Sequence, residues 1–423
     1  MNVHNLEEKF EKLIEYLCYC LIFALPISIA FVEVFSVLLI LSWLIKQFYM
    51  LVKNPQKSSL KEERYFETKI YFWLPMIAFF IVSFISTLTS QNISLSIKGI
   101  IGKTGEHLLL CYIFIKTFSK SQNRKFKIVF FVIFLSALLI YSDALIQWFY
   151  GKDFIRGIDS RRLTASFKSP NSFAGWLIVV LPILISTISV NLEIFSKYLS
   201  ITIKIFAVTL ILCSIILLMK TVSKGAWVGF CFSLSLMFFL SIFFQIEKPK
   251  VAWLLYCGML ITVLLSYFIL KAQVQQRIEL FIRWIIGVTE VRPTLWKEAI
   301  SIIKDYPLFG SGPNTYASIV LFYKTTSYSG IYPHNSYLQM AAEIGLIGLS
   351  SFLWMIFTFF CQGICALRKY KDPFLLGILC GLIAYLVHSF FDVNLFTLQL
   401  GILFWVVLGL GLARIKSLEK QIS

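Results

Sequence analysis

Apolar runs long enough to cross a bilayer follow one another along most of this chain. A transmembrane helix needs roughly 20 apolar residues. Hydrophobic residues make up 58% of the 423 residues and the mean hydropathy is +0.80, which is more apolar surface than a soluble fold could bury. The sequence therefore predicts an all-α integral membrane protein with about twelve transmembrane helices. The runs lie at about residues 13–31, 34–52, 70–89, 105–118, 128–149, 172–190, 199–219, 225–244, 251–270, 344–367, 374–391 and 395–413.

The runs fill so much of the length that we expect one polytopic domain, residues 1–423, rather than several domains. The fourth run is short and contains Glu106 and His107, so it is the least typical span. Residues 271–335, between the ninth and tenth runs, are predicted to form a large helical loop. Apolar residues from Val274 to Ile285 recur in this loop at amphipathic spacing, which suits a helix on the membrane surface.

The distribution of Lys and Arg predicts the orientation of the chain. Of the 39 such residues, 23 lie on the side that carries both termini, which the positive-inside rule places in the cytoplasm. The net charge of +17 therefore indicates membrane orientation rather than nucleic-acid binding. The remaining cations gather in residues 151–171, at Lys220 and Lys224, and in residues 271–324. Cations on the disfavoured side indicate an anionic ligand there.

Metal and cofactor sites are not expected. All nine Cys lie inside apolar runs, where they act as small packing residues rather than as disulfides or thiolate ligands. The carboxylates on the outer side include no D-x-D pair, and no two His residues have the spacing of metal ligands. We therefore expect a site without metal and without a cofactor.

The stretch from Arg292 to Gly348 holds the polar groups with the clearest chemical use. Arg292 begins a helical pattern that has Trp296 on its buried side. His334 and the residue after it open a further helix that continues through Glu343. A lone His is often structural, but His334 lies where several outer cations can converge. As a neutral imidazole it could take a proton from a hydroxyl nucleophile, typically worth about 10²–10⁴-fold in rate.

Three further clusters lie on the same outer side. The segment R-R-L-T-A-S-F-K-S-P-N, residues 161–171, leads into a helix start that suits an anion, although a capped loop with snorkelling cations is an alternative. The tight turn T-V-S-K-G-A-W, residues 221–227, presents Lys224. In H-S-F-F-D, residues 388–392, Asp392 could orient His334, and a structural ion pair is equally open.

In order along the chain, these segments resemble the O-antigen ligase and polymerase family of bacterial envelope glycosyltransferases. The first cluster resembles the family pattern R-x-x-G-x-F-x-x-P-N, and the turn resembles S-R-G-A-W. The segments R-P-T-L-W-K-E-A and P-L-F-G-S-G-P-N resemble R-x-x-x-W-x-x-A...P-x-x-G-x-G, and H-N-S-Y-L-Q-M-A-A-E-I-G-L-I-G resembles H-N-x-x-L...E-x-G-x-x-G. The resemblance covers about residues 160 to 395.

The resemblance implies a GT-C-like glycosyltransferase of the bacterial inner membrane, with its active site in the periplasm and a glycan on undecaprenyl diphosphate as the donor. Arg292 and Lys224 would hold the diphosphate, and His334 would activate the acceptor hydroxyl. Lys224 stands where the family usually has Arg, so a point charge replaces a planar fork, and Ala165 replaces a Gly. Further cations that could share the diphosphate are Arg161, Arg162 and Lys220. The expected supporting residues are Asn171, Asn335, Glu343 and Asp392.

The acceptor implied first is a hydroxyl of the lipid A core oligosaccharide, which would make the enzyme an inverting O-antigen ligase. A repeat-unit polymerase with a lipid-linked glycan as acceptor uses the same donor chemistry. A protein O-oligosaccharyltransferase is a third reading. A non-catalytic lipid or glycan transporter is a fourth, but such a protein is expected to carry ionisable residues near the membrane midplane. The expected partners are the lipid-linked donor, the acceptor and membrane lipids.

Overall fold

The computed structural model describes residues 3–53, 70–120, 123–160, 162–188, 197–246, 256–257, 260–261, 264, 291–325 and 330–421. Within these ranges the regular structure is helical, apart from one isolated bridge between Lys152 and Asp159. The longer helices are α1 (Val3–Ala24), α2 (Ile29–Lys53), α4 (Ile70–Leu88), α6 (Glu106–Ser119), α7 (Asn123–Tyr150), α8 (Pro170–Thr187), α9 (Lys197–Thr221), α10 (Lys224–Phe243), α13 (Val291–Asp305), α15 (Ser336–Tyr370), α16 (Pro373–Ser389) and α17 (Leu398–Lys420). The short ones are α5 (Ile93–Gly99), η2 (Ile100–Gly105), α14 (Tyr316–Ile319), η3 (Val320–Phe322) and η4 (Asn394–Phe396).

Five of the described helices are long and apolar enough to cross a membrane, namely α2, α7, α10, α15 and α17. Shorter apolar stretches lie in α4, α8, α9 and α16. These helices confirm the prediction of an all-α membrane protein. The predicted surface helix at Val274–Ile285 and most of the ninth run lie outside the described residues.

The first helix boundary differs from the sequence-based one. The run predicted at 13–31 contains the end of α1, a turn and the start of α2, because Pro26 lies in the turn and proline cannot donate a backbone hydrogen bond inside a helix. The short fourth run is α6, which packs against α17. A Cβ at Gly409 would lie 2.8 Å from the carbonyl oxygen of Cys111, so a small residue allows this close contact.

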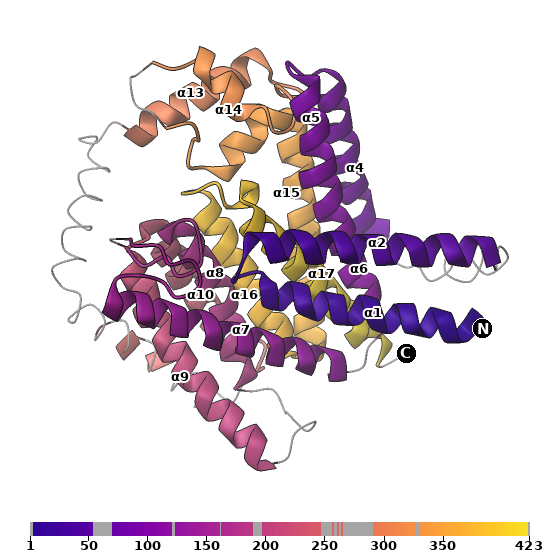
Figure 1. The fold of residues 1–423 in the computed structure, drawn as a ribbon, viewed down its shortest axis with the longest axis vertical. Helices are drawn as coiled ribbons and strands as arrows, with labels where there is room; N and C mark the ends of the chain where they lie inside the picture. The colour runs from indigo at the N-terminus through magenta and orange to yellow at the C-terminus, as the bar shows by residue number, and fades with distance from the viewer. Residues whose placement is uncertain are drawn as a thin grey trace.

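The helix α15 is broken at Gly345, whose φ is +75°. The loop after α13 supplies partners for the backbone groups that the break releases. The Leu346 N–H donates to the Pro307 carbonyl at 2.8 Å, and the Gly312 N–H donates to the Glu343 carbonyl at 2.8 Å. A Cβ at Gly345 would lie 2.0 Å from the Leu308 carbonyl oxygen. Two Gly-rich blocks therefore interlock, namely P-L-F-G-S-G-P-N, residues 307–314, and E-I-G-L-I-G, residues 343–348. Figure 1 shows α13 and α14 beside α5 and the upper part of α15.

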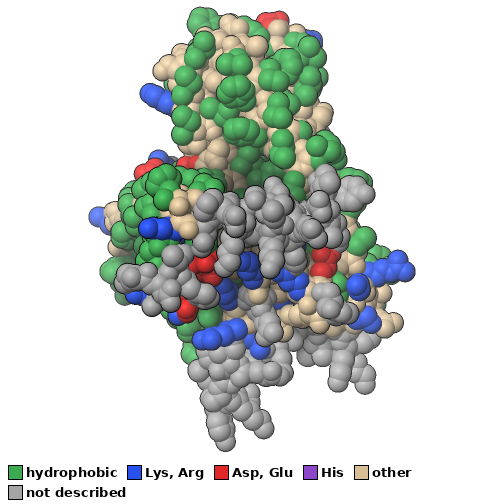
Figure 2. Space-filling view, turned by 90° about the vertical axis from the view of Figure 1, so that its right-hand side faces the viewer, with side chains coloured by type: hydrophobic (Ala, Val, Ile, Leu, Met, Phe, Trp, Pro, Cys, Tyr) green, Lys and Arg blue, Asp and Glu red, His purple; other side chains and the backbone are tan. Residues whose placement is uncertain are grey.

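Both termini lie on the same side of the molecule in Figure 1. Figure 2 views the molecule from that side and shows Lys and Arg side chains gathered across its middle, with hydrophobic side chains covering the upper part. A buried ion pair joins two helix ends: the Arg414 guanidinium donates to the Asp372 carboxylate at 2.6 Å and to the Asn123 side chain at 2.8 Å. The starts of α7 and α16 and the C-terminal part of α17 are thereby held together.

Candidate active site

His334 lies in the turn that precedes α15, with the Asn335 side chain as the helix cap. The Asn335 Oδ1 accepts from the N–H groups of Tyr337 and Leu338 at 2.9 and 3.0 Å, which confirms the predicted helix start. The φ of His334 is +47°, a left-handed conformation that costs a non-glycine residue of order 1–3 kcal/mol. Its side chain is 38% exposed, so the strained turn leaves part of the imidazole accessible at the surface.

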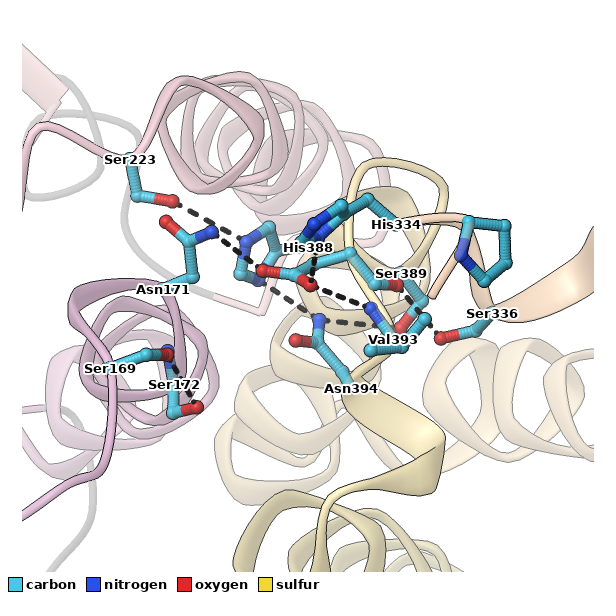
Figure 3. A network of polar contacts seen from close by, with 12 residues as sticks. Ser169, Asn171, Ser172, Ser223, His334, Ser336, His388, Ser389, Val393 and Asn394 are labelled. Carbon is cyan, nitrogen blue, oxygen red and sulfur yellow. Dashed lines mark hydrogen bonds and ion pairs between the residues drawn. The ribbon is translucent and has the colours of Figure 1, made fainter. Parts of the chain in front are cut away.

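Asp392, from the loop after α16, receives donors from three segments (Figure 3). The His334 Nδ1 lies 3.1 Å from the Asp392 Oδ1. The Val393 N–H donates to the same oxygen at 2.8 Å, and the Asn171 side chain donates to the Oδ2 at 2.6 Å. Burial alone would raise the pKa of Asp392, but the hydrogen bond from His334 and the charges of His334 and His388 outweigh it and lower this pKa to about 2.

The ionised Asp392 determines which nitrogen of His334 carries the proton. A carboxylate accepts only, so the Nδ1 of a neutral His334 must be the protonated one. The Nε2 then keeps its lone pair and can accept a proton from a hydroxyl. Asp392 also stabilises the imidazolium that this transfer produces. Asp392 is therefore placed to orient His334, which is one of the two roles left open by the sequence.

Arg162 joins the first cluster to the turn before α10. Its Nε and Nη2 atoms donate to the Thr221 carbonyl at 3.0 and 2.7 Å, and Nη2 also donates to the Val222 carbonyl at 3.1 Å. The same Nη2 lies 3.4 Å from the Asn171 Oδ1. Arg162 thus fixes the turn that presents Lys224, the first residue of α10. Its role as a diphosphate ligand stays a prediction.

A second histidine, His388, lies fully buried beneath this turn. The Asn394 side chain donates to its Nδ1 at 3.0 Å, so its Nε2 carries the proton and faces the Ser223 hydroxyl at 3.4 Å. The sequence argument assigned no role to His388. The sequence nevertheless contained a signal for this residue, because His388 is one of only four His residues and lies four positions before Asp392.

Arg292, the second residue of α13, lies close enough to His388 for an electrostatic interaction. One turn later, the Trp296 indole N–H donates to the Pro333 carbonyl at 2.9 Å. The indole ring also meets the Phe390 ring edge to face, with 5.6 Å between centroids. The structure therefore brings the helix that carries Arg292 against both the His334 turn and the end of α16.

Other predicted site residues lie apart from this network. The Lys220 ammonium lies over the Trp148 ring, 4.3 Å from its centroid. The Glu343 carboxylate accepts from the Asn314 N–H at 2.7 Å and from the Gln339 side chain at 3.0 Å, so it supports the loop that fills the break in α15. Arg161 lies outside the described residues.

The described residues contain no group of three or more His, Cys, Asp or Glu side chains that could hold a metal ion. Both carboxylate oxygens of Asp392, the residue in contact with His334, already accept a hydrogen bond. The arrangement can abstract a proton through His334 and bind an anion through Arg292 and the turn that carries Lys224. Absence of a catalytic metal stays a prediction.

Comparison with known proteins gives a family match over part of the chain. A family model described as O-antigen ligase matches residues 206–353. The matched stretch contains Lys224, Arg292, Trp296, His334 and Glu343. No curated protein matches the chain. Residues 206–353 therefore match the O-antigen ligase family, which supports the resemblance predicted from the sequence.

Proposed function

We propose that this protein is an O-antigen ligase, a glycosyltransferase that moves a glycan from undecaprenyl diphosphate to a hydroxyl of the lipid A core oligosaccharide. The observation that carries the proposal is the contact between the His334 Nδ1 and the Asp392 Oδ1 at 3.1 Å. This contact links His334, the proposed general base, to the polar network that Arg292 approaches. The family match over residues 206–353 supports this class of reaction.

Proton transfer and bond cleavage occur on opposite faces of the sugar in this mechanism. The acceptor hydroxyl gives its proton to the His334 Nε2, and its oxygen forms a bond to C1 of the donor sugar. The bond from C1 to the diphosphate oxygen breaks, and its electron pair stays on the diphosphate. Arg292 and Lys224 stabilise the negative charge that grows on this oxygen. Attack opposite the leaving group inverts the configuration at C1 without a metal ion.

The proposed orientation has both termini in the cytoplasm and the active site in the periplasm of a bacterial inner membrane. The basic side chains on the side that carries both termini support it (Figure 2), because cytoplasmic loops are enriched in Lys and Arg. The site is formed at helix ends that belong to the opposite side, namely the start of α8, the start of α10 and the end of α16. A lipid diphosphate in the outer leaflet would reach these ends.

A competition between acceptors tests the function. The purified protein in lipid nanodiscs is given an undecaprenyl-diphosphate glycan together with core lipid A and a second lipid-linked glycan. We expect the glycan on core lipid A with the wild-type protein, and a transfer rate at least about a hundredfold lower with the correctly inserted variant His334→Ala. Product on the lipid-linked glycan would instead identify a polymerase. A protein that moves the lipid across the bilayer and forms no glycosidic bond would be a transporter.

A further inference from the structure

Trp296 lies one helical turn after Arg292 on α13, so both side chains leave the same face of the helix. The Trp296 indole N–H donates to the Pro333 carbonyl oxygen at 2.9 Å. The spacing R-x-x-x-W therefore places the Arg292 guanidinium and a hydrogen bond to the His334 turn on one rigid element. Displacing Trp296 would displace Arg292 with it.

The Pro333 carbonyl belongs to the backbone on the N-terminal side of His334. This carbonyl belongs to the peptide bond that joins Pro333 to His334, and a peptide unit is planar and stiff. Holding its oxygen holds the peptide plane on one side of the His334 N–Cα bond, the bond about which φ is +47°. A left-handed residue other than glycine persists only where its surroundings hold it. The indole N–H is one such restraint.

The indole ring also restrains the segment of Asp392, which forms a dyad with His334 through their 3.1 Å contact. It packs edge to face on Phe390, with 5.6 Å between centroids. Phe390 follows the last residue of α16 and lies two positions before Asp392. The Ser336 hydroxyl, at the start of α15, donates to the Asp392 carbonyl at 2.9 Å and joins the same two segments from the other side. One Trp side chain thus contacts both segments that supply the dyad.

We propose that Trp296 is a positioning residue of the transfer reaction. Its N–H holds the peptide before His334, its ring holds the segment before Asp392, and its helix carries Arg292. In this role Trp296 touches no reacting atom. It affects the reaction by holding the position of the His334 imidazole. This inference rests on the proposed glycosyl transfer.

The variant Trp296→Phe removes the N–H and keeps an aromatic ring for Phe390. We expect kcat for glycan transfer to fall about tenfold, the effect of one lost hydrogen bond, with the donor KM within about threefold of wild type. Trp354→Phe makes the same change on a Trp of α15 that is 44% exposed. This control should keep wild-type kcat and KM.

A double-mutant cycle separates positioning from simple stabilisation. If Trp296 acts through His334, Trp296→Phe should cost nothing further in the residual transfer rate of His334→Ala. Equal loss in both backgrounds, with a lowered melting temperature, would make Trp296 only a fold-stabilising residue and overturn the proposal. Unchanged kcat in Trp296→Phe would overturn it as well. Absence of transfer by the wild-type protein would overturn the proposed function itself, and with it this role.

Discussion

Asp392 determines the state of the site through the hydrogen bonds that it accepts. His334, Val393 and Asn171 all donate to its carboxylate, and each donor favours the charged form. A charged Asp392 keeps the proton of a neutral His334 on Nδ1 and leaves Nε2 as a base. The chemical role of His334 therefore depends on a residue 58 positions away.

The lowered pKa of Asp392 makes a prediction about stability and pH. Above about pH 4, near the ordinary pKa of Asp, the carboxylate is charged in both the folded and the unfolded chain. Between about pH 4 and pH 2 the unfolded chain binds a proton that the folded chain does not, so stability falls as the pH falls. The contribution of Asp392 is about 2 kcal/mol. Thermal unfolding of detergent-purified protein should show this loss.

The variant Asp392→Asn is the control for that experiment. It has no carboxylate at this position, so its melting temperature should change less between pH 4 and pH 2 than that of the wild type. It should also transfer glycan at least tenfold more slowly at neutral pH, since the His334 imidazolium loses its counter-charge. An equal dependence on pH in both proteins would contradict the assignment of the pKa shift to folding.

Arg162 gives a second prediction at the scale of one residue. Its planar guanidinium reaches two carbonyls and the Asn171 side chain, which the single ammonium of Lys cannot match. We expect Arg162→Lys to raise the donor KM several-fold, because the turn that presents Lys224 loosens. Arg156→Lys, an exposed cation of the same loop, should leave the KM unchanged. Steady-state transfer kinetics with both variants decide between these outcomes.

At the scale of elements, the break in α15 has a structural purpose. A helix that ran straight through Gly345 would have no room for the loop that follows α13. The break admits this loop, and the Ser311 N–H donates to the Ala342 carbonyl at 2.9 Å. The loop in turn fixes the end of α13, the helix that carries Arg292. Two Gly-rich blocks that resemble a family signature thus position the site without touching it.

Replacing Gly345 by Ala tests this interlock. The new Cβ would have to lie 2.0 Å from the Leu308 carbonyl oxygen, at a φ of +75°. We expect the loss of stability to exceed the roughly 1–3 kcal/mol of backbone strain alone, seen as a lower melting temperature and a lower yield of monodisperse protein. Gly102→Ala is the control, since no atom lies within 4 Å of its Cβ position. A stable Gly345→Ala protein would contradict the interlock.

At the scale of the whole molecule, the structural ion pair of Arg414 and Asp372 lies apart from the polar groups of the candidate site. The Arg414 and Asp372 ion pair ties helix ends together on the side of the C-terminus. On the opposite side, loops and helix ends supply His334, Asp392 and the Lys224 turn. Because these groups lie beyond the apolar lengths of α16 and α17, we expect the proposed chemistry to take place across the membrane from the termini.

Reporter fusions test that arrangement in cells. Alkaline phosphatase, which folds only in the periplasm, should be inactive when fused after Ser423 and active when inserted at Lys152. A green fluorescent protein at the same positions should give the reverse pattern. Phosphatase activity at the C-terminus would overturn the proposed orientation. Expression of each fusion is checked by immunoblot of the membrane fraction.

Helices were predictable because apolar length is a local property. The runs at 128–149 and 225–244 correspond closely to α7 and α10, since a span must bury one continuous stretch in lipid. The run at 13–31 gave a wrong boundary, because composition alone hid the turn at Pro26. The sequence alone also did not show that Glu343 supports the loop after α13. Its carboxylate accepts from the Asn314 backbone, which is distant in the sequence, and from Gln339, one turn earlier on α15.

The amino-acid sequence determined that this chain is a helical membrane protein, and it predicted an anionic ligand for the outer cations and His334 as the base. Apolar length, charge bias and residue chemistry act locally and can be read in order. Only the tertiary structure decided that Asp392 contacts His334, that Arg162 donates to the carbonyls of the turn before Lys224 and that Trp296 joins α13 to the segments of His334 and Asp392. Those contacts join residues from different helices, and only the packing of the helices in three dimensions brings such residues together.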